Sequence, residues 1–393
     1  MAGIHTIRGK VAIAGVGESR YYKRGGSPVS EFRLALHAIL AAAEDAGLDP
    51  GEIDGFASYS GDRNDPTRIA AALGCHDLAF ANMVWGGGGG GCAAAVGNAA
   101  AAVSAGYAKY VVAFRSLAQG QFGRFGQARP SPAVQGIMAL TAPYGVFTPA
   151  QWIAMRTKRF MHDYRIRQDA LANIALASYH HAQRNPRAVM YGRPLTREDY
   201  DNSRWIAEPF HLFDCCQEND GAAAVIITTP ERARDLRHRP AYLLGAAQGA
   251  VVGHHLVYPA GAKLGAANFD TVAPRLFEMA GVTPADVDVA QIYENFTGGT
   301  LMSLVEHGFC APDEVNEFCT FENLTWDGGK LPINTSGGNL AECYTHGFEL
   351  VTEAVRQVRG TSTCQVEGAA ISFVGAGPCA SPVSSIILSA ERP

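Results

Sequence analysis

The sequence predicts an α/β fold made of two similar halves that meet near residue 240. The chain has 393 residues, enough for two or three domains and a large buried core. Only 18% of the residues are charged and 44 are glycine, a composition that favours a tightly packed interior. A segment that begins at Ala46 recurs in similar form at Ala280, and the elements expected around both copies follow in the same order.

The two copies of this repeat span 46–54 and 280–288. Around each copy we expect a strand, a helix and a second strand: 10–15, 32–45 and 55–58 in the first half, and 241–245, 269–279 and 289–293 in the second. In both copies Gly follows the helical pattern and Pro begins the next turn, as is typical where a helix ends. The sequence therefore predicts an N-terminal half, 1–240, and a C-terminal half, 241–393.

The stretch from about 125 to 215 interrupts the first half and is richer in charged and aromatic residues. Helical patterns cover 148–164 and 168–185. An excursion of this length is more typical of a functional cap than of a simple connection, so we expect it to cover a site. The run from Asp220 to Ile227 then predicts a buried strand that completes the first half.

Composition excludes several classes of function. The chain carries 32 basic and 37 acidic residues and a net charge of −5, so it lacks the electrostatic signature of a nucleic-acid or anionic-membrane binder. It shows no strongly apolar run long enough to span a bilayer and no signal peptide at its N-terminus, so we expect a soluble, cytoplasmic protein. Nine cysteines without CxxC spacing argue against a disulfide framework and a zinc ribbon, and we expect no metal site.

The most unusual segment is the glycine run from Gly86 to Gly91, which follows Trp85 and precedes an Ala-rich helical pattern from Cys92. A flexible linker is the alternative, but linkers are normally flanked by polar residues. A glycine run before a helix lets the backbone approach a ligand and directs N–H groups toward it. We therefore favour an element of a site, although the run matches neither a dinucleotide fingerprint nor a phosphate loop.

Three further segments combine polar residues with glycine turns: 292–297, 334–347 and 373–378. The first ends the repeat strand of the second half, the second precedes a helix expected at 348–359, and the third lies between apolar strands. Strand ends and helix starts are the places where α/β folds build their sites. We therefore expect these segments to meet the glycine run.

Together these segments resemble the thiolase superfamily, and in particular its sterol-carrier, lipid-transfer-protein branch. The stretch from Asp220 to Ala224 also looks like the DGAAA strand of that family. The resemblance covers essentially the whole chain. It implies the duplicated, five-layer αβαβα thiolase fold and a homodimer.

The usual catalytic groups of a thiolase are absent at the matching positions. The position of the nucleophilic Cys falls at about Gly89, and the two catalytic His positions match Tyr293 and Tyr344. The late CxG motif matches Phe373-Val374-Gly375, which removes the second Cys. Cys92 lies three residues after Gly89, where we expect a buried structural thiol. Because thiolysis needs a nucleophile that carries the acyl group, ordinary thiolase chemistry is not expected.

Tyrosines at both His positions resemble the side-chain-cleaving aldolases of bacterial steroid degradation. Retro-aldol cleavage needs a base, an acid and donors to an enolate, but no covalent acyl-enzyme. Tyr344, shortly before a helix, is the candidate base, because a helix N-terminus or neighbouring donors would lower the pKa of its phenol. Tyr293 is the candidate donor or acid, although the sequence leaves open which tyrosine plays which part.

Supporting roles are expected for five further residues. The oxyanion site is expected at the backbone N–H groups of Gly89, Gly338 and Gly375. Asn295 is a candidate for orienting a water or the thioester. His346 is a candidate helix cap or a partner of the tyrosines.

The resemblance implies retro-aldol cleavage of a steroid side-chain β-hydroxyacyl-CoA to a 17-ketosteroid and propionyl-CoA. It implies no cofactor, since CoA is part of the substrate, and a partner of the small OB-fold type with a zinc ribbon. Two alternatives stay open: an acyl-CoA acetyltransferase or thiolase that uses Cys92, and a non-catalytic lipid or acyl-CoA carrier. The sequence does not identify the ring system of the substrate.

Overall fold

The computed structural model describes residues 7–86, 88–123, 134–253 and 263–393. Gly87 of the glycine run and residues 125–133 of the expected cap lie outside this part. Within it, one ten-stranded mixed sheet runs in the order β10-β11-β12-β9-β1-β8-β5-β3-β4, and β2 pairs with β8 beside this path. Its strands are β1 (Ala12–Glu18), β2 (Tyr22–Lys23), β3 (Gly55–Tyr59), β4 (Phe80–Val84), β5 (Val111–Ala118), β8 (Asn219–Thr228), β9 (Ala241–Gly249), β10 (Val289–Ile292), β11 (Ile371–Ala376) and β12 (Val383–Ser389).

The two halves of the sheet have the same topology. In the first half β3 pairs parallel with β5, and then β5, β8 and β1 follow antiparallel. In the second half β10 pairs parallel with β11, and β11, β12 and β9 follow antiparallel. The halves join where Ala12 and Ile13 of β1 pair with Tyr242 and Ala241 of β9. The strand order therefore agrees with the duplication predicted from the repeat.

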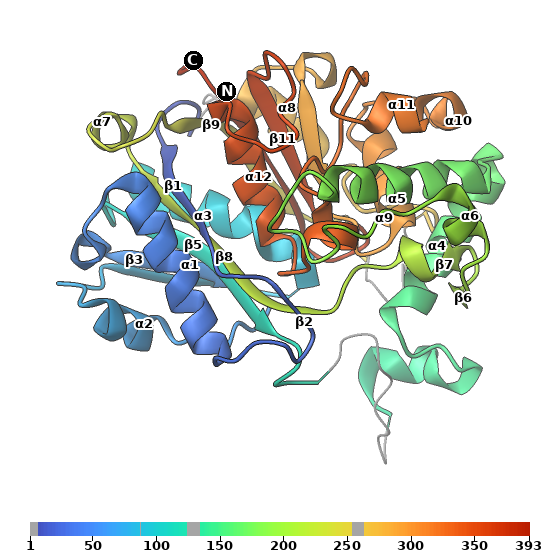
Figure 1. Ribbon diagram of the computed structural model, residues 1–393, viewed down its shortest axis with the longest axis horizontal. Helices are drawn as coiled ribbons and strands as arrows, with labels where there is room; N and C mark the ends of the chain where they lie inside the picture. Colours follow the sequence, from blue (N-terminus) through green and yellow to red (C-terminus); the bar gives the residue numbers. More distant parts are fainter. Residues whose placement is uncertain (1–6, 87, 124–133, 254–262) are drawn as a thin grey trace.

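The longer helices form three layers. One layer covers the outer face of each half of the sheet, and the third lies between the two halves. Helix α1 (Glu31–Ala46) covers β1, β5 and β8 from outside, and α8 (Ala273–Ala280) covers β9 and β12. Helices α3 (Cys92–Ser104) and α12 (Phe348–Arg359) contact strands of both halves and therefore lie between them (Figure 1). This arrangement is the expected five-layer αβαβα order.

The repeat itself forms the same structure twice. Helix α1 ends at Ala46, where Gly47 takes a positive φ of 69°, and α8 ends at Ala280, where Gly281 has a φ of 64°. A 3-10 turn follows each helix, beginning at Pro50 in the first half and at Pro284 in the second. The helix ends predicted from Gly and Pro are thus confirmed in both copies.

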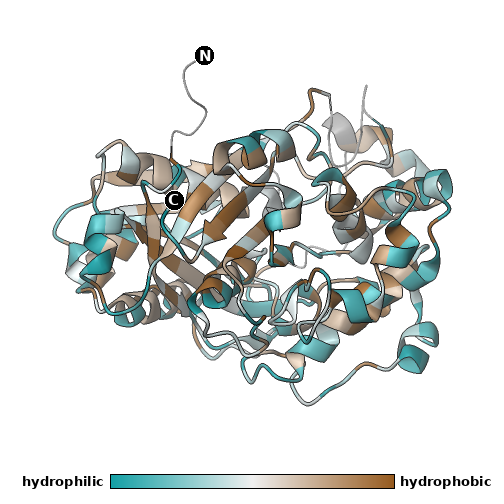
Figure 2. Ribbon diagram, turned by 90° about the horizontal axis from the view of Figure 1, so that it is seen from above, coloured by the Kyte–Doolittle hydropathy of each residue, from teal (hydrophilic) through white to brown (hydrophobic). Residues whose placement is uncertain are grey.

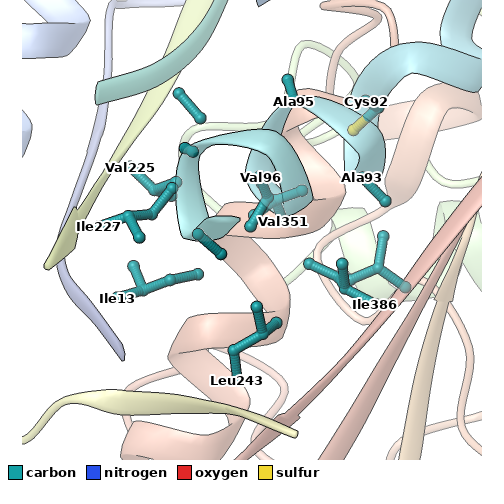
Figure 3. Close-up of a cluster of buried hydrophobic side chains, with 14 of the residues drawn as sticks. Ile13, Cys92, Ala93, Ala95, Val96, Val225, Ile227, Leu243, Val351 and Ile386 are labelled. Carbon is teal, nitrogen blue, oxygen red and sulfur yellow. The ribbon is translucent and has the colours of Figure 1, made fainter. Parts of the chain in front are cut away.

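The central helices pack in an apolar core built from both halves. Figure 3 shows Val96 of α3 and Val351 of α12 between Ile13, Val225 and Ile227 of the first half and Leu243 and Ile386 of the second. Figure 2 shows the strands in this interior as largely brown, with teal concentrated on the surrounding helices and loops. A small-residue helix suits this place, because the alanines of α3 let the two flanks of the sheet approach closely.

The cap belongs to the first half in sequence but packs on the second half in space. Its elements α4 and α5 contact α9 (Thr297–Glu306), and α5 also contacts α11 (Phe321–Leu324), as can be followed at the right of Figure 1. The cap elements are α4 (Pro149–Tyr164), α5 (Gln168–Ala182), α6 (Arg197–Asp201), β6 (Trp205–Ala207) and β7 (Phe210–His211). The remaining short helices are α2 (Pro66–Leu73), α7 (Pro230–Arg234) and α10 (Val315–Phe318).

None of the helices in the described ranges combines the length and the apolar character that crossing a membrane requires.

Candidate active site

A cavity of about 1220 Å³ lies where the cap, the glycine run and the strand ends of both halves meet. The cap contributes Thr148 to Ala150, Ile153, Tyr179 and the stretch around Leu212 and Phe213. The core contributes Gly88 and Gly89, Tyr293, Asn295, Tyr344, His346 and the turn at Gly377 and Pro378. The four segments singled out in the sequence therefore meet at one site.

The two tyrosines form a direct pair at this cavity. The Oη atoms of Tyr293 and Tyr344 are 2.7 Å apart, within hydrogen-bond distance, and both side chains are almost fully buried. Their rings meet edge to face at 6.0 Å between centroids. One hydroxyl must donate to the other, so the pair forms a short path along which a proton can move.

Each tyrosine is positioned by the end of a regular element. Tyr293 directly follows β10, and its backbone N–H donates to the carbonyl of Gly375 in β11 at 2.8 Å. Tyr344 lies just before α12, and its backbone N–H donates to Oδ1 of Asn219 at 2.9 Å. Strands of both halves therefore hold the pair.

The ring of Tyr293 is packed against two glycines. A Cβ at position 89 would lie 2.1 Å from a ring carbon of Tyr293, and a Cβ at position 347 would lie 2.5 Å from another. Gly347 also has a φ of 91°, a conformation that favours glycine. Neither position can carry a side chain while Tyr293 keeps this place.

The glycine run is not a free linker. A Cβ at Gly90 would lie 1.9 Å from the carbonyl oxygen of Pro382, and one at Gly91 would lie 2.4 Å from Cβ of Tyr59. The run forms a 3-10 turn, Gly88–Gly91, that leads into α3. Glycine is needed here because three consecutive positions are each in contact with a different neighbour.

Burial determines the protonation of the tyrosine pair, in the direction opposite to our expectation. It raises the pKa of both phenols well above the ordinary value of 10.0, and the neighbouring Tyr344 raises the pKa of Tyr293 further. The sequence had predicted a lowered pKa for Tyr344 near a helix N-terminus. Because the hydroxyl lies in a buried pair, desolvation outweighs any such effect, and both tyrosines are neutral near pH 7.

Cys92 lies in the interior, outside the cavity lining. Its side chain is fully buried, Sγ donates to the carbonyl of Gly347 at 3.1 Å, and the residue is absent from the cavity lining. Burial raises the pKa of this thiol well above 9.0. A nucleophilic Cys needs the opposite conditions, namely access to the ligand and a lowered pKa.

His346 and Asn295 both line the cavity. The imidazole of His346 stacks on Tyr59 at 6.0 Å and meets Tyr344 edge to face at 5.6 Å. Burial, together with the nearby Arg115 cation, lowers the pKa of His346 well below 6.5, so the ring is neutral near pH 7. Oδ1 of Asn295 is buried without a hydrogen-bond partner among the described residues, so its capacity to accept a hydrogen bond is unused there.

Two of the three expected oxyanion glycines do not line the cavity. A Cβ at Gly338 would meet the carboxyl group of Glu294, and Gly375 pairs within the sheet with Ile292 and Ser385. Gly375 lies within β11 and Gly338 begins a helical turn, Gly338–Glu342, so both backbone groups are outside the cavity lining. Gly89 does line the cavity, together with Gly88 and Gly377.

Within residues 7–86, 88–123, 134–253 and 263–393, no three His, Cys, Asp or Glu side chains gather in a way that could hold a metal ion.

Comparison with known proteins identifies the family. A family model described as "Thiolase C-terminal domain-like" matches residues 252–390. A steroid side-chain-cleaving aldolase of Thermomonospora curvata is 40% identical over 393 residues, which cover 98% of this chain and 99% of the relative. The chain is a member of the thiolase superfamily.

Two further proteins agree with this membership. The 17-hydroxy-3-oxo-4-pregnene-20-carboxyl-CoA lyase of Mycobacterium tuberculosis is 40% identical over 391 residues, covering 97% of this chain and 100% of the relative. The solved aldolase named Ltp2-ChsH2(DUF35) has a TM-score of 0.91 and 39% identity, over 99% of this chain and 100% of that one. By these full-length relationships, this thiolase-superfamily member belongs to the enzymes that cleave C–C bonds.

Sequence reasoning missed a buried polar network beneath the tyrosines of this thiolase-superfamily site. Glu294 accepts hydrogen bonds from Ser178 of the cap at 3.0 Å, and its backbone N–H donates to Oδ1 of Asn339 at 2.8 Å. Glu349 accepts from the Asn339 amide and from the Thr345 hydroxyl. The available signal was position in the sequence, because Glu294 follows Tyr293 directly and Glu349 lies in the first turn of the helix after Tyr344.

Burial raises the pKa of both carboxyl groups in this network, to about 8 for Glu294 and about 7 for Glu349. Both carboxyl groups therefore hold their protons to a higher pH than exposed carboxyl groups do. The polar network of Glu294 and Glu349 therefore carries less negative charge than two ionised carboxyl groups would.

Proposed function

We propose that the chain catalyses the retro-aldol cleavage of a steroid side-chain β-hydroxyacyl-CoA, releasing a 17-ketosteroid and propionyl-CoA. The lyase of Mycobacterium tuberculosis is named for a 17-hydroxy-3-oxo-pregnene carboxyl-CoA, and its whole length matches this chain. The Thermomonospora curvata relative is named for cleavage of a steroid side chain. Both relatives support the same reaction class for this site.

The observation that carries the proposal is the contact of 2.7 Å between Oη of Tyr293 and Oη of Tyr344 at the cavity. We assign Tyr344 as the base and Tyr293 as the acid of one proton relay. The tertiary O–H of the substrate gives its proton to Tyr344, Tyr344 passes its own proton to Tyr293, and Tyr293 delivers a proton to the α-carbon of the acyl group. The O–H and C–C bonds break, and the ketone and the new C–H bond form.

This relay suits neutral phenols. Both tyrosines end the reaction with the number of protons they had at the start, so no phenolate has to persist in a buried site that disfavours it. Since no acyl group is carried by the enzyme, Gly can stand at position 89. The N–H of Gly89 and the side chain of Asn295 are candidates to stabilise the thioester enolate, and His346 to hold the ring of Tyr344.

The cavity suits a bulky apolar substrate. Its volume of about 1220 Å³ exceeds the range of about 300–1,000 Å³ that is usual for small-molecule pockets. Ile153, Ile206, Leu212, Phe213 and Phe296 give its wall a largely apolar side. A fused-ring steroid would remove this surface from water.

The decisive experiment is turnover of a 17-hydroxy steroid C22-CoA thioester with free CoA omitted, because thiolysis consumes CoA and retro-aldol cleavage does not. We expect propionyl-CoA and the 17-ketosteroid in equal amounts. Product formed only when CoA is added would support the thiolase alternative and Cys92. Binding of the thioester without product, even with the partner protein present, would support the carrier alternative.

A partner of the DUF35 kind, a small OB-fold protein with a zinc ribbon, belongs to the same proposal. The similar aldolase structure is named Ltp2-ChsH2(DUF35). Co-expression with such a protein should yield one complex on size-exclusion chromatography and higher turnover than the chain alone. Equal activity without the partner would contradict a requirement for it.

We also propose a homodimer through the outer edge of the first half. Strand β4 is the end strand of the sheet. Large exposed side chains lie near this edge: Met83 within β4, Trp85 directly after β4, and Tyr107 shortly after the end of α3. Trp85 is 91% exposed, which is unusual for an indole. Light scattering should give a dimer mass for the wild type and a monomer mass for Trp85→Glu; a wild-type monomer would contradict the proposal. A cytoplasmic location remains a prediction.

A further inference from the structure

Ser60 has a backbone conformation that normally favours glycine. It directly follows β3, lines the cavity and has a φ of 55°, in the left-handed region. Its neighbour Gly61 has a φ of 63°, so two consecutive residues share this conformation. Position 61 carries glycine, as such a backbone favours, whereas position 60 carries a side chain in spite of the steric cost. A strained serine beside a cavity suggests a function for its hydroxyl.

A buried ion pair holds the chain in this conformation. Nη1 of Arg115 donates to the carbonyl of Tyr59 at 2.8 Å, and Nη2 donates to the carbonyl of Ser60 at 3.4 Å. Nη1 also lies 3.1 Å from the Asp62 carboxylate, and both charged side chains are almost fully buried. The same carboxylate accepts the hydroxyl of Ser58 at 3.0 Å. The left-handed backbone of Ser60 is therefore imposed by its surroundings and not by its own preference.

The hydroxyl of Ser60 contacts the glycine run. Its Oγ lies 2.6 Å from the carbonyl oxygen of Gly88 and 3.1 Å from that of Gly86, and it donates to these acceptors. Both glycines have a positive φ, 52° for Gly88 and 77° for Gly86. Since neither has a side chain that restricts its backbone, the run depends on contacts from other segments for its conformation. Ser60 provides such a contact from the end of β3.

The contact with Gly88 determines the direction of the Gly89 N–H. The carbonyl of Gly88 and the N–H of Gly89 belong to one peptide unit, which is trans. In a planar trans unit the C=O and N–H bonds point in opposite directions. A hydroxyl bound to the carbonyl oxygen therefore holds the N–H on the other side of the unit, away from Ser60. Gly89 is the second residue of the turn Gly88–Gly91, where an N–H has no partner within the turn.

We propose that Ser60 is a positioning residue that directs the N–H of Gly89 toward the thioester oxygen of the substrate. This role rests on the proposed function, in which Gly89 is a candidate donor to the thioester enolate. A preorganised donor stabilises developing charge because its direction is set before the reaction begins. A glycine run alone cannot supply this preorganisation, since its peptide units rotate with little hindrance.

Two variants that lack the hydroxyl separate this role from a structural one, in CoA-free turnover of the steroid thioester by the full chain with its partner where one is needed. Glycine relieves the left-handed backbone and alanine does not, so Ser60→Gly should have a higher melting temperature than Ser60→Ala. Both should lower kcat to a similar extent, by about 10–100-fold, with KM within about threefold. Activity should therefore not follow stability.

Ser60→Thr gives the opposite combination. It keeps the hydroxyl, but a β-branched residue is strained at a positive φ, so its melting temperature should be lower than that of the wild type. Its kcat should nevertheless exceed that of Ser60→Gly. Ser27→Ala is the matched control, because it removes a half-buried hydroxyl that donates to the carbonyl of Val29 at 2.8 Å, outside the cavity lining. It should keep the kcat of the wild type.

An infrared measurement reads the donor without turnover. The probe is a 17-deoxy steroid C22-CoA thioester with a ¹³C-labelled carbonyl, which lacks the hydroxyl that cleavage requires. Because a hydrogen bond lowers the stretching frequency of a carbonyl, the band of the bound probe should move to higher wavenumber in Ser60→Gly and Ser60→Ala. It should stay at the wild-type position in Ser60→Thr and Ser27→Ala.

Three results would overturn the role of Ser60: wild-type kcat in Ser60→Gly, an unchanged band in Ser60→Ala, or an equal fall in kcat in Ser27→Ala and Ser60→Ala. The proposed reaction fails separately. A wild type that binds the probe but releases no propionyl-CoA from the 17-hydroxy substrate would contradict the reaction, and the expected band shifts would still support the positioning role. Normal cleavage with an unchanged band in Ser60→Ala would contradict the positioning role alone.

Discussion

The ring of Tyr293 occupies the space that a side chain at position 89 would need, with only 2.1 Å between a ring carbon and the place of a Cβ at Gly89. In the resemblance to thiolases, the nucleophile falls at about position 89 and one catalytic histidine falls at position 293. The two departures from the thiolase pattern are therefore linked by a steric contact between the two positions. A tyrosine at position 293 requires glycine at position 89, and a cysteine there would displace the ring from Tyr344.

We predict that Gly89→Ala lowers kcat by about 100-fold or more, because a displaced Tyr293 loses its contact with Tyr344, and misplacement of a catalytic group by about 1 Å can cost that much. The measurement is propionyl-CoA release at saturating substrate. Gly97→Ala is the matched control, since a Cβ there would lie 3.1 Å from the methyl group of Ala246, within α3 and away from the cavity lining. Similar kcat values for Gly89→Ala and the control would contradict the linkage.

The tyrosine pair should act as one unit. Tyr293→Phe and Tyr344→Phe are each expected to lower kcat by roughly 10²–10⁴-fold, with KM little changed because the rings remain. The double variant should be about as slow as either single variant, since breaking a relay once already removes it. A double variant whose loss equals the product of the two single losses would show that the hydroxyls act independently.

Tyr200→Phe controls for the loss of a buried phenol. The hydroxyl of Tyr200 donates to Asp214 at 2.8 Å, and the residue lies outside the cavity lining. This variant should lose stability, on the order of 1 kcal/mol, and keep its kcat within about twofold. A comparable fall in kcat would mean that the tyrosine effects arise from general loosening of the fold.

Local sequence patterns were sufficient for the duplicated fold. Gly47 and Gly281 end equivalent helices, and the apolar strands around them pair in the same order in both halves. These signals are short in range, because a helix end depends on a few neighbouring residues. The family resemblance supplied the expectation that Tyr293 and Tyr344 would meet.

The details of the site depend on contacts that no local pattern encodes. The raised pKa of Tyr344 results from burial and from the nearby Cys216, which outweigh the lowering effect of the hydrogen bond with Tyr293, and these residues are far apart in the chain. Gly375 lies within β11, paired with Ile292, and Gly338 packs against the carboxyl group of Glu294, so that neither lines the cavity. Ser60 carries no motif at all, and its contacts with the glycine run are visible only in three dimensions.

Cys92 should be dispensable for catalysis. We predict that Cys92→Ala keeps kcat within about twofold and loses about 1 kcal/mol of stability, because it removes one buried sulfur and its hydrogen bond to the carbonyl of Gly347. The measurement combines CoA-free turnover with urea unfolding. Abolished turnover in a folded Cys92→Ala protein would instead favour the alternative function, a thiolase that uses Cys92.

Glu294 should make the stability of the protein fall as the pH rises. Its folded-state pKa of about 8 lies above the ordinary value of 4.5, so between these values the unfolded chain releases a proton that the folded chain keeps. Each pH unit in this window lowers the free energy of unfolding by up to about 1.4 kcal/mol. Glu294→Gln removes this dependence and retains an acceptor for the hydroxyl of Ser178.

Urea unfolding at about pH 5 and about pH 8 measures the effect. The two proteins should be of similar stability at the lower pH, and the advantage of Glu294→Gln should grow toward the higher pH and level off above it. Glu278→Gln, at an exposed position on α8, should follow the wild type at both values. A constant difference between Glu294→Gln and the wild type would mean that Glu294 stays ionised throughout, and the tyrosine pair would then stand above a fixed negative charge that opposes formation of the enolate.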